Sequence, residues 1–190
     1  MFIRVVDEGL EHLFRAELPL PEDVGDISFD APTGTWAAQL SRITVNLFLY
    51  DIGRSTLPSR AMTQRVTVNG QAQQRPQQPM VRLSYLVSAW AGNARDEHQL
   101  LGDVISRCAA LSELPQQHLL GEVSSPVHLT FAEDERTRQR EVWNGVGGQL
   151  KPSFTLQANL AADTFDWRDA APAVTRIETL MPPHPARLFG

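Results

Sequence analysis

Residues 80–90, MVRLSYLVSAW, carry the pattern that decides the fold. Apolar side chains occupy every second position from Val81 to Ala89, which is the two-residue period of a β-strand. The alternate positions are partly apolar too, because Met80 and Leu86 lie among them. The pattern therefore predicts a strand with one fully apolar face and a second face that is half apolar.

A helix is expected directly after this strand. Asp96, followed three positions later by Gln99, has the form of a capping box, which predicts a helix start near Glu97. Apolar residues then recur at helical spacing and form one stripe: Leu100, Leu101, Val104, Ile105, Cys108 and Leu111. Because Cys108 is the only cysteine and falls on this stripe, we interpret it as a buried structural thiol.

The remaining patterns predict an α+β fold, with one mostly antiparallel sheet flanked by helices. Residues 3–18 have the 3–4 spacing of an amphipathic helix, and residues 43–50, ITVNLFLY, form a strand that is apolar on both faces and so central in a sheet. Weaker patterns predict strands at 26–30, 123–131, 153–161 and 173–180 and a charged surface helix at 132–143. Pro126 places the 123–131 strand at an edge or at a strand start.

A long insertion separates the two strongest strands. Residues 52–79 are rich in Gln and contain no acidic residue, and Asn69-Gly70 after Val66 to Val68 is a hairpin-turn signal. We interpret residues 53–79 as a basic β-arm that projects from a domain at residues 1–161, and residues 162–190 as an extended, Pro-rich C-terminal extension. The arginines of the arm are Arg54, Arg60, Arg65 and Arg75.

The sequence offers no set of residues for catalysis, and we predict no enzyme, no catalytic residue, no cofactor and no metal. The five histidines are scattered, and none has a metal-ligand spacing. Asp96 to His98 are explained by favourable charge at a helix start. Gly145 to Gly148 with Lys151 do not form a phosphate-binding loop, because the predicted helix precedes these glycines and a strand follows them.

Charge and hydropathy limit the possible partners. The net charge is −5, which does not favour nucleic-acid binding by the chain as a whole. A nucleic-acid-binding module that uses the arm at 53–79 is an alternative, although the arm sequence has no aromatic residue for base stacking. A protein surface of opposite sign is the better partner for these arginines. No apolar run approaches the ~20 residues that cross a bilayer, so no membrane contact is expected.

Three segments together resemble a known family. TVNLFLYDI (44–52), RPQQPMVRLSYLVSAW (75–90) and DEHQLLG (96–102), followed by Trp143 and KPSF (151–154), are similar to the tail-cap, or tail-terminator, proteins of phage-tail-like contractile injection systems. The resemblance covers roughly residues 3–161. It implies a phage tail-terminator-like fold.

The resemblance also implies a structural role. Members of this family form a ring, usually a hexamer, on the end of the inner tube distal to the baseplate. The implied partners are the chain itself, the tube protein and the sheath protein, with no nucleic acid and no membrane. Assembly is expected in the cytoplasm, as a component of a particle that can be released. The expected interface residues are Arg54, Arg60, Arg65, Arg75 and Arg82.

Overall fold

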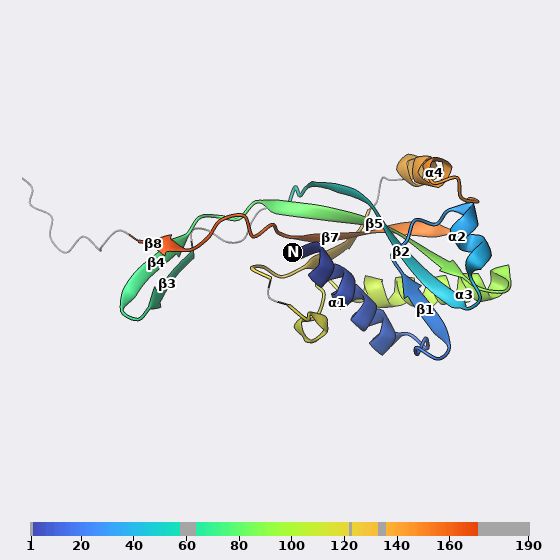
Figure 1. Ribbon diagram of the computed structural model, residues 1–190, viewed down its shortest axis with the longest axis horizontal. Coiled ribbons are helices and arrows are strands. Elements are labelled where there is room, and N and C mark those ends of the chain that lie inside the picture. Colours follow the sequence, from blue (N-terminus) through green and yellow to red (C-terminus); the bar gives the residue numbers. More distant parts are fainter. Residues whose placement is uncertain (1, 58–63, 122, 133–135, 171–190) are drawn as a thin grey trace, which may run out of the picture.

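The computed structural model describes residues 2–57, 64–121, 123–132 and 136–170 (Figure 1). A five-stranded sheet forms the centre, with the strand order β1-β2-β5-β7-β6. All neighbouring strands are antiparallel except β1 and β2, which are parallel. The strands are β1 (Gly25–Ser28), β2 (Ile43–Arg54), β5 (Met80–Trp90), β6 (His128–Phe131) and β7 (Ser153–Ala161). The predicted α+β class with a mostly antiparallel sheet is confirmed.

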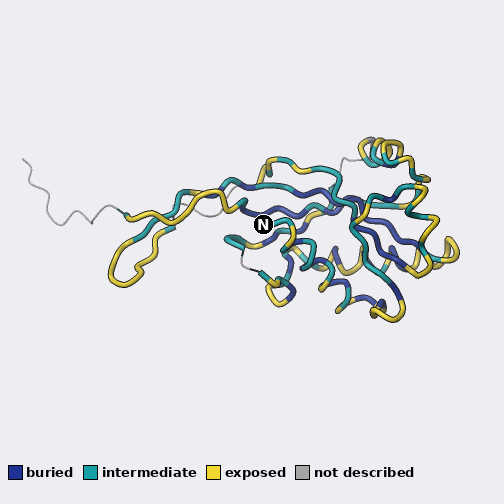
Figure 2. The backbone as a smooth tube through the Cα atoms, viewed as in Figure 1, coloured by how far each residue is buried: buried dark blue, intermediate teal, exposed yellow. Residues whose placement is uncertain are grey.

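Helices cover both faces of this sheet (Figure 1). They are α1 (Phe2–Glu17), α2 (Gly34–Gln39), α3 (Ala94–Ala109) and α4 (Arg136–Gly145), and a short 3₁₀ helix, η1 (Gln116–His118), contacts α1. The buried residues of α1 and α3 form one core cluster with one sheet face, and residues of α2 and α4 form a second cluster with Leu86 and Trp90 on the opposite face. Figure 2 shows the central strands as the most buried part of the chain.

The strand that decides the fold has the predicted bounds. On β5, Leu83, Tyr85 and Val87 are fully buried in the larger core cluster. Leu86 and Trp90 face the other way, where Trp90 lies between Trp36 and Trp143, at ring-centroid distances of 5.2 and 6.2 Å. Both faces of β5 are therefore covered, which explains why its sequence is apolar on both sides.

The predicted helix cap is wrong by three residues. Asn93 caps α3, because its Oδ1 accepts hydrogen bonds of 3.0 Å from the backbone N–H groups of Arg95 and Asp96. Asp96 lies inside the first turn and accepts a hydrogen bond of 2.6 Å from the Asn93 amide. The helix therefore starts after Asn93 and not after Asp96, because Asn93 has the extended backbone that is typical of an N-cap residue.

The apolar stripe of α3 is confirmed for four of its six residues. Leu100, Leu101, Val104 and Cys108 are buried, whereas Leu111 lies past the helix end and is half-buried. Ile105 is 38% exposed. At about 100° per residue, Ile105 falls about 40° beyond the edge of the buried arc that runs from Leu100 to Leu101. Burial raises the pKa of the Cys108 thiol to about 12, as a structural thiol requires.

Other differences are local. The six-residue helix α2 is not among the predicted elements, and Thr33 caps it through a 3.1 Å hydrogen bond from the Trp36 backbone N–H. The strand expected at 123–131 is formed only at 128–131, at the edge of the sheet, as Pro126 indicated. The charged helix α4 is a surface element as expected, but its Trp143 is buried. The strand expected at 173–180 lies outside the described residues.

Candidate assembly interface

A β-hairpin extends from one end of the domain (Figure 1). Its strands are β3 (Gln64–Val68) and β4 (Gln71–Arg75), joined by Asn69 and Gly70. Both turn residues have positive φ angles, 50° and 79°, which is the backbone of the two-residue turn that matches the twist of paired strands. The hairpin predicted from Asn69-Gly70 is confirmed.

The hairpin gains a third strand from a distant part of the sequence. In β8 (Arg168–Asp169), Asp169 pairs with Gln73 and Arg168 with Gln74. The backbone N–H of Ala170 also donates to the Ala72 carbonyl at 2.8 Å. We call the three strands β3, β4 and β8 the arm. Its order β3-β4-β8 repeats the order β2-β5-β7 of the core sheet. The arm is therefore a continuation of the three central strands of the domain.

Hydrogen bonds hold the three crossing segments together where the arm meets the domain. The amide of Gln78 binds the segment after β7: its oxygen accepts from the backbone N–H groups of Thr164 and Phe165, at 2.8 and 2.9 Å, and its nitrogen donates to the Phe165 carbonyl at 2.7 Å. Ser55, at the end of β2, donates to the Asn159 side chain at 2.7 Å. Gln78 is buried, so this joint fixes the path of the chain into β8.

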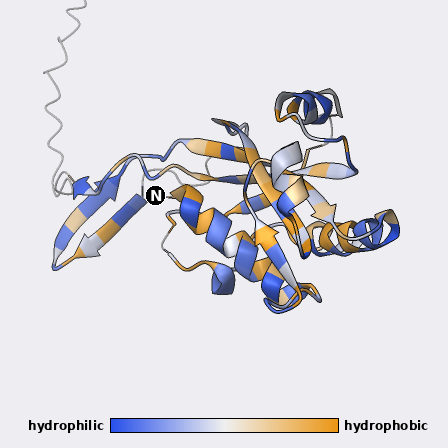
Figure 3. Ribbon diagram, turned by 45° about the vertical axis from the view of Figure 1, so that its right-hand side comes forward, coloured by the Kyte–Doolittle hydropathy of each residue, from blue (hydrophilic) through white to orange (hydrophobic). Residues whose placement is uncertain are grey.

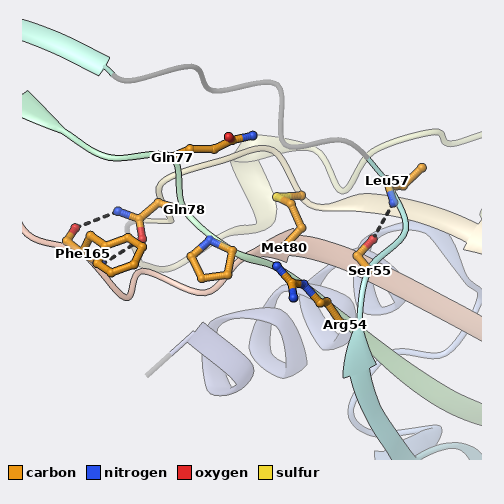
Figure 4. A pocket seen from close by; sticks show the side chains of 8 residues that line it. Arg54, Ser55, Leu57, Gln77, Gln78, Met80 and Phe165 are labelled. Carbon is orange, nitrogen blue, oxygen red and sulfur yellow. Dashed lines mark hydrogen bonds between the residues drawn. The ribbon is translucent and has the colours of Figure 1, made fainter.

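A hollow of about 350 Å³ opens beside this joint. Figure 4 shows its lining side chains, which include Arg54, Leu57, Gln78, Met80 and Phe165. Among the described residues that line the hollow, the charged group is the Arg54 guanidinium, and none is a carboxylate, histidine or cysteine. The described lining thus brings together neither a nucleophile paired with a base nor a set of metal ligands.

The two faces of the arm differ. Residues directly opposite each other in the ladder share a face, so Val66, Val68 and Gln73 lie on one face, and Arg65 with Gln74 on the other. Trp167 lies on the Val66 face, since its ring lies 5.0 Å from the Arg75 guanidinium. Val66 is 39% and Val68 47% exposed. Figure 2 shows the arm as exposed or half-buried, and Figure 3 shows it as mostly hydrophilic.

The four described arginines of the proposed interface have different surroundings. Arg54 and Arg65 are exposed, whereas Arg75 donates a 2.9 Å hydrogen bond to Gln64 and stacks on Trp167. Arg82 lies on β5 in the domain, 3.5 Å from Asp51. Arg60 lies outside the described residues.

Sequence reasoning missed the contribution of the C-terminal segment to this surface. The segment brings Trp167 next to Arg75, and it also brings Asp163, Asp166 and Asp169. The hairpin at 64–75 has two arginines and no acidic residue, but the complete arm is less basic than its first two strands. The two residues of β8 are too few to show the two-residue period of a strand, so the sequence did not predict it.

A separate ion pair lies at the end of the domain opposite the arm. The Lys151 ammonium binds the Glu97 carboxylate, and it also lies 4.2 Å from the centre of the Trp90 ring. Glu97 further accepts a 3.3 Å hydrogen bond from the backbone N–H of Ala91. These contacts join the start of α3 to the start of β7, so Glu97 and Lys151 have structural partners. In the described part of the chain, no group of three or more potential metal ligands is present.

Comparison with known proteins identifies the family. Residues 5–176 match the family described as the Pvc16 N-terminal domain. The chain belongs to the Pvc16 N-terminal domain family. The tail-terminator resemblance seen in the sequence is thereby confirmed. No curated protein matches the chain.

Solved structures share the Pvc16 N-terminal fold. The sheath/tube terminator of the PVC extracellular contractile injection system, in its extended state, has a TM-score of 0.69 at 20% identity and covers 97% of this chain. The tube-terminating cap of the anti-feeding prophage has a TM-score of 0.58 at 18% identity and covers 94%. The predicted tail-terminator-like fold is confirmed. The chain spans 64% and 60% of the lengths of these two proteins.

The match with the Pvc16 family includes the arm. The matched range, 5–176, contains β3, β4 and β8 as well as the five-stranded sheet.

Within the described residues, no helix has both the length and the apolar character required to span a membrane.

Proposed function

We propose that the chain is a structural cap protein that terminates the tube and the sheath of a contractile injection system as a homo-oligomeric ring. The observation that carries this proposal is the arm: three strands that extend out of the domain without a core of their own. Every described residue of β3 and β4 is exposed or half-buried. Membership of the Pvc16 N-terminal domain family and the similarity in fold to two terminator proteins support it.

The energetics of the arm favour a partner. Two-stranded and short three-stranded sheets are at best marginally stable in water without an apolar face packed against something. In the described arm, β3 and β8 are edge strands, and each leaves one row of backbone hydrogen-bonding groups open. An open edge can add a strand from another chain, which uses backbone hydrogen bonds for affinity. An arm of this kind fits an assembly contact.

We also propose the domains and the partners of the chain. Residues 1–161 are the tail-terminator-like domain, 53–79 the basic segment of it that supplies two strands of the arm, and 162–190 the C-terminal extension, which supplies the third. The ring is a hexamer that contacts the tube protein and the sheath protein, and it assembles in the cytoplasm as part of the particle. Exposed Arg54 and Arg65 are the arginines best placed for these contacts, together with Arg60, Arg75 and Arg82. We propose no catalytic activity, cofactor or metal.

The alternative, a nucleic-acid-binding module that uses the arm, receives one observation in its favour. Trp167 supplies an aromatic ring that the arm sequence at 53–79 lacks. That ring is already stacked with Arg75, however, and Asp166 and Asp169 flank it at one and two residues' distance. Binding measurements with single- and double-stranded nucleic acid at low and high salt separate the two functions, because phosphate contacts produce a steep salt dependence.

Particle morphology tests the cap function. In a strain that lacks this protein, negative-stain images should show tubes of uncontrolled length or particles that lose their sheath. Expression of the wild-type chain should restore a narrow length distribution, and a chain with the hairpin 64–75 deleted should not. The matched control is an exposed substitution away from the arm, Arg95→Ala, which should restore length as the wild type does. Normal particles in the deletion strain contradict the proposal.

A further inference from the structure

The C-terminal part of the arm is attached to the molecule through few contacts. We call residues 164–170 the strap. The strap binds the buried amide of Gln78, where Phe165 lies (Figure 4), pairs with β4 at two positions and stacks Trp167 on Arg75. None of its residues is buried, and none belongs to either core cluster. The strap can therefore leave the arm without disturbing the core of the domain.

A single residue with an unfavourable backbone connects the strap to the core sheet. Asp163 has a φ angle of 46°, in the left-handed region. Before it, the backbone N–H of Ala162 donates to the Pro79 carbonyl at 2.9 Å, and after it, the N–H of Thr164 donates to Gln78 at 2.8 Å. Aspartate can adopt this backbone because its short side chain can form a local hydrogen bond. The exposed Asp163 carboxylate has no hydrogen bond or ion pair with a described residue, so no such contact offsets the cost.

The arm of a second copy offers the strap the same contacts. Because the copies are identical, a strap that reaches another arm binds Gln78 and β4 there through the same hydrogen bonds. What differs between the two arrangements is the connection, which no longer has to take the left-handed backbone at Asp163. We infer that the strap is exchanged in the ring, so that β8 of each copy pairs with β4 of the next copy.

The proposed ring supplies the condition for this exchange. In a free chain the nearest arm is the strap's own, so the strap binds there. In a ring the neighbouring arm is held at a comparable effective concentration, and the backbone at Asp163 then decides between the two arrangements. Each copy gives one strap and accepts one, so the contact is head-to-tail and repeats until the ring closes. The inference rests on the proposed ring and assigns it a contact.

Two residues of the β4–β8 ladder are suited to a cysteine cross-link. Gln73 on β4 lies directly opposite Asp169 on β8. The next pair, Ala72 and Ala170, carries a backbone hydrogen bond of 2.8 Å, so Gln73 and Asp169 form a non-hydrogen-bonded pair. Side chains lie closest at such pairs, and their spacing suits a disulfide. A disulfide at this pair therefore reports which chain supplies β8.

Mixed cross-linking tests the exchange. Chains with Gln73→Cys and chains with Asp169→Cys are mixed as free chains, assembled on purified tubes and then oxidised. Non-reducing gels should show a covalent dimer that contains one chain of each kind. The natural Cys108 is buried and should not react. The matched control mixes Val66→Cys with Gln73→Cys, which lie opposite each other within the hairpin of one chain, so the mixture should form no more dimer than either variant alone.

The connecting residue gives a second, directional readout in the same mixture. Asp163→Gly removes the cost of the left-handed backbone, so the yield of mixed dimer should fall about fivefold. Asp163→Pro fixes φ at about −65° and excludes the unexchanged connection, so the yield should rise. Asp166→Ala, at an exposed strap residue outside the left-handed region, should leave the yield unchanged. Circular dichroism should show all variants folded, because none of the substituted positions is buried.

The outcomes separate the exchange from the cap function. Rings that form without a mixed dimer, or a dimer yield that Asp163→Gly leaves unchanged, overturn the exchange and leave the ring standing. A chain that stays monomeric even on tubes refutes the ring and the exchange together. Rings that contain the mixed dimer but do not limit tube length refute the cap function and leave the exchange standing.

Discussion

The hydroxyl of Tyr85, at the centre of the sheet, donates a 2.7 Å hydrogen bond to the carboxylate of Asp7 on the first helix. Tyr85 is fully buried and Asp7 is half-buried. Burial is the main cause of a raised pKa for both groups, although the hydrogen bond itself acts to lower the pKa of Asp7. The helix α1 is thus attached to the sheet by a polar contact inside an otherwise apolar layer.

Replacing Tyr85 by Phe should lower the free energy of unfolding by about 1.5–3 kcal/mol, because a partly buried carboxylate loses its donor. Urea unfolding monitored by circular dichroism measures this loss. Ser55→Ala is the comparison: the Ser55 hydroxyl donates a 2.7 Å hydrogen bond to the neutral Asn159 side chain, and its removal should cost less, about 0.5–1.5 kcal/mol. Equal costs for the two variants contradict the assignment.

The same contact predicts a pH dependence. Because the pKa of Asp7 is raised in the folded chain, the stability linked to this group is fully present below its unfolded pKa and is lost as pH rises through the folded value. Asp7→Asn keeps an acceptor for Tyr85 and cannot ionise. Between about pH 4 and pH 7 the wild type should therefore lose stability relative to this variant. Asp30→Asn, at an exposed position, is the control. Parallel stability curves for wild type and Asp7→Asn would refute the prediction.

The corrected helix cap makes a prediction of its own. Asn93→Ala should destabilise the domain by about 0.5–2 kcal/mol, since two backbone N–H groups lose their acceptor. Asp96→Ala should cost less, because its carboxylate serves mainly the Asn93 amide and the helix dipole. Asn93→Asp should be close to the wild type. A larger cost at Asp96 than at Asn93 would restore the capping box expected from the sequence.

Paired substitutions in α3 test which residues belong to the core. Leu101→Ala should cost about 2–5 kcal/mol, as should Leu47→Ala in β2, because both side chains are buried in the main core cluster. Ile105→Ala, four residues after Leu101 in the same helix, should change stability by no more than about 0.5 kcal/mol. Thermal unfolding of the three variants gives the comparison, and a large loss at Ile105 would place it in a contact that the exposed surface does not show.

The arginines of residues 53–79 should affect assembly rather than folding. Simultaneous replacement of Arg54, Arg60, Arg65 and Arg75 by Ala should reduce particle assembly and leave the unfolding midpoint of the domain nearly unchanged. Replacement of Arg4 and Arg95, which are exposed on helices away from the arm, is the control and should affect neither measurement. Electron microscopy of particles and thermal unfolding of the purified chain provide the two readouts. Unaltered assembly would mean that the arm acts through its apolar face and backbone alone.

The sequence predicted the elements whose pattern is long enough to be periodic. The eleven residues of β5 and the stripe from Leu100 to Cys108 were found in this way, and so was the hairpin, because Asn69-Gly70 fixes a turn by local backbone preference. Local patterns did not predict the start of α3 correctly, because both Asn93 and Asp96 are residue types that cap helices. They also gave too little information on α2, which has only six residues.

The arm as a surface could be predicted only in part. Its hairpin is local, but the pairing of Gln73 with Asp169 joins residues nearly a hundred positions apart. That pairing follows from the strand β7, which directs the chain out of the domain beside β5, and not from any preference of the two-residue strand itself. The neighbours of Arg75 and the burial of Trp143 depend on the same kind of long-range packing, which a single sequence does not display.

The continuity of β2, β5 and β7 with the arm has a mechanical consequence. A tension applied along the arm pulls β2, β5 and β7 in the same direction, so it loads in shear the ladders that join them to the two edge strands, from Gly25–Ile43 to Ser28–Asn46 and from His128–Asn159 to Phe131–Leu156. Backbone hydrogen bonds loaded in shear must break together, whereas those at the end of a peeled strand break one at a time. The arm is therefore anchored in the direction in which the sheet best resists extension.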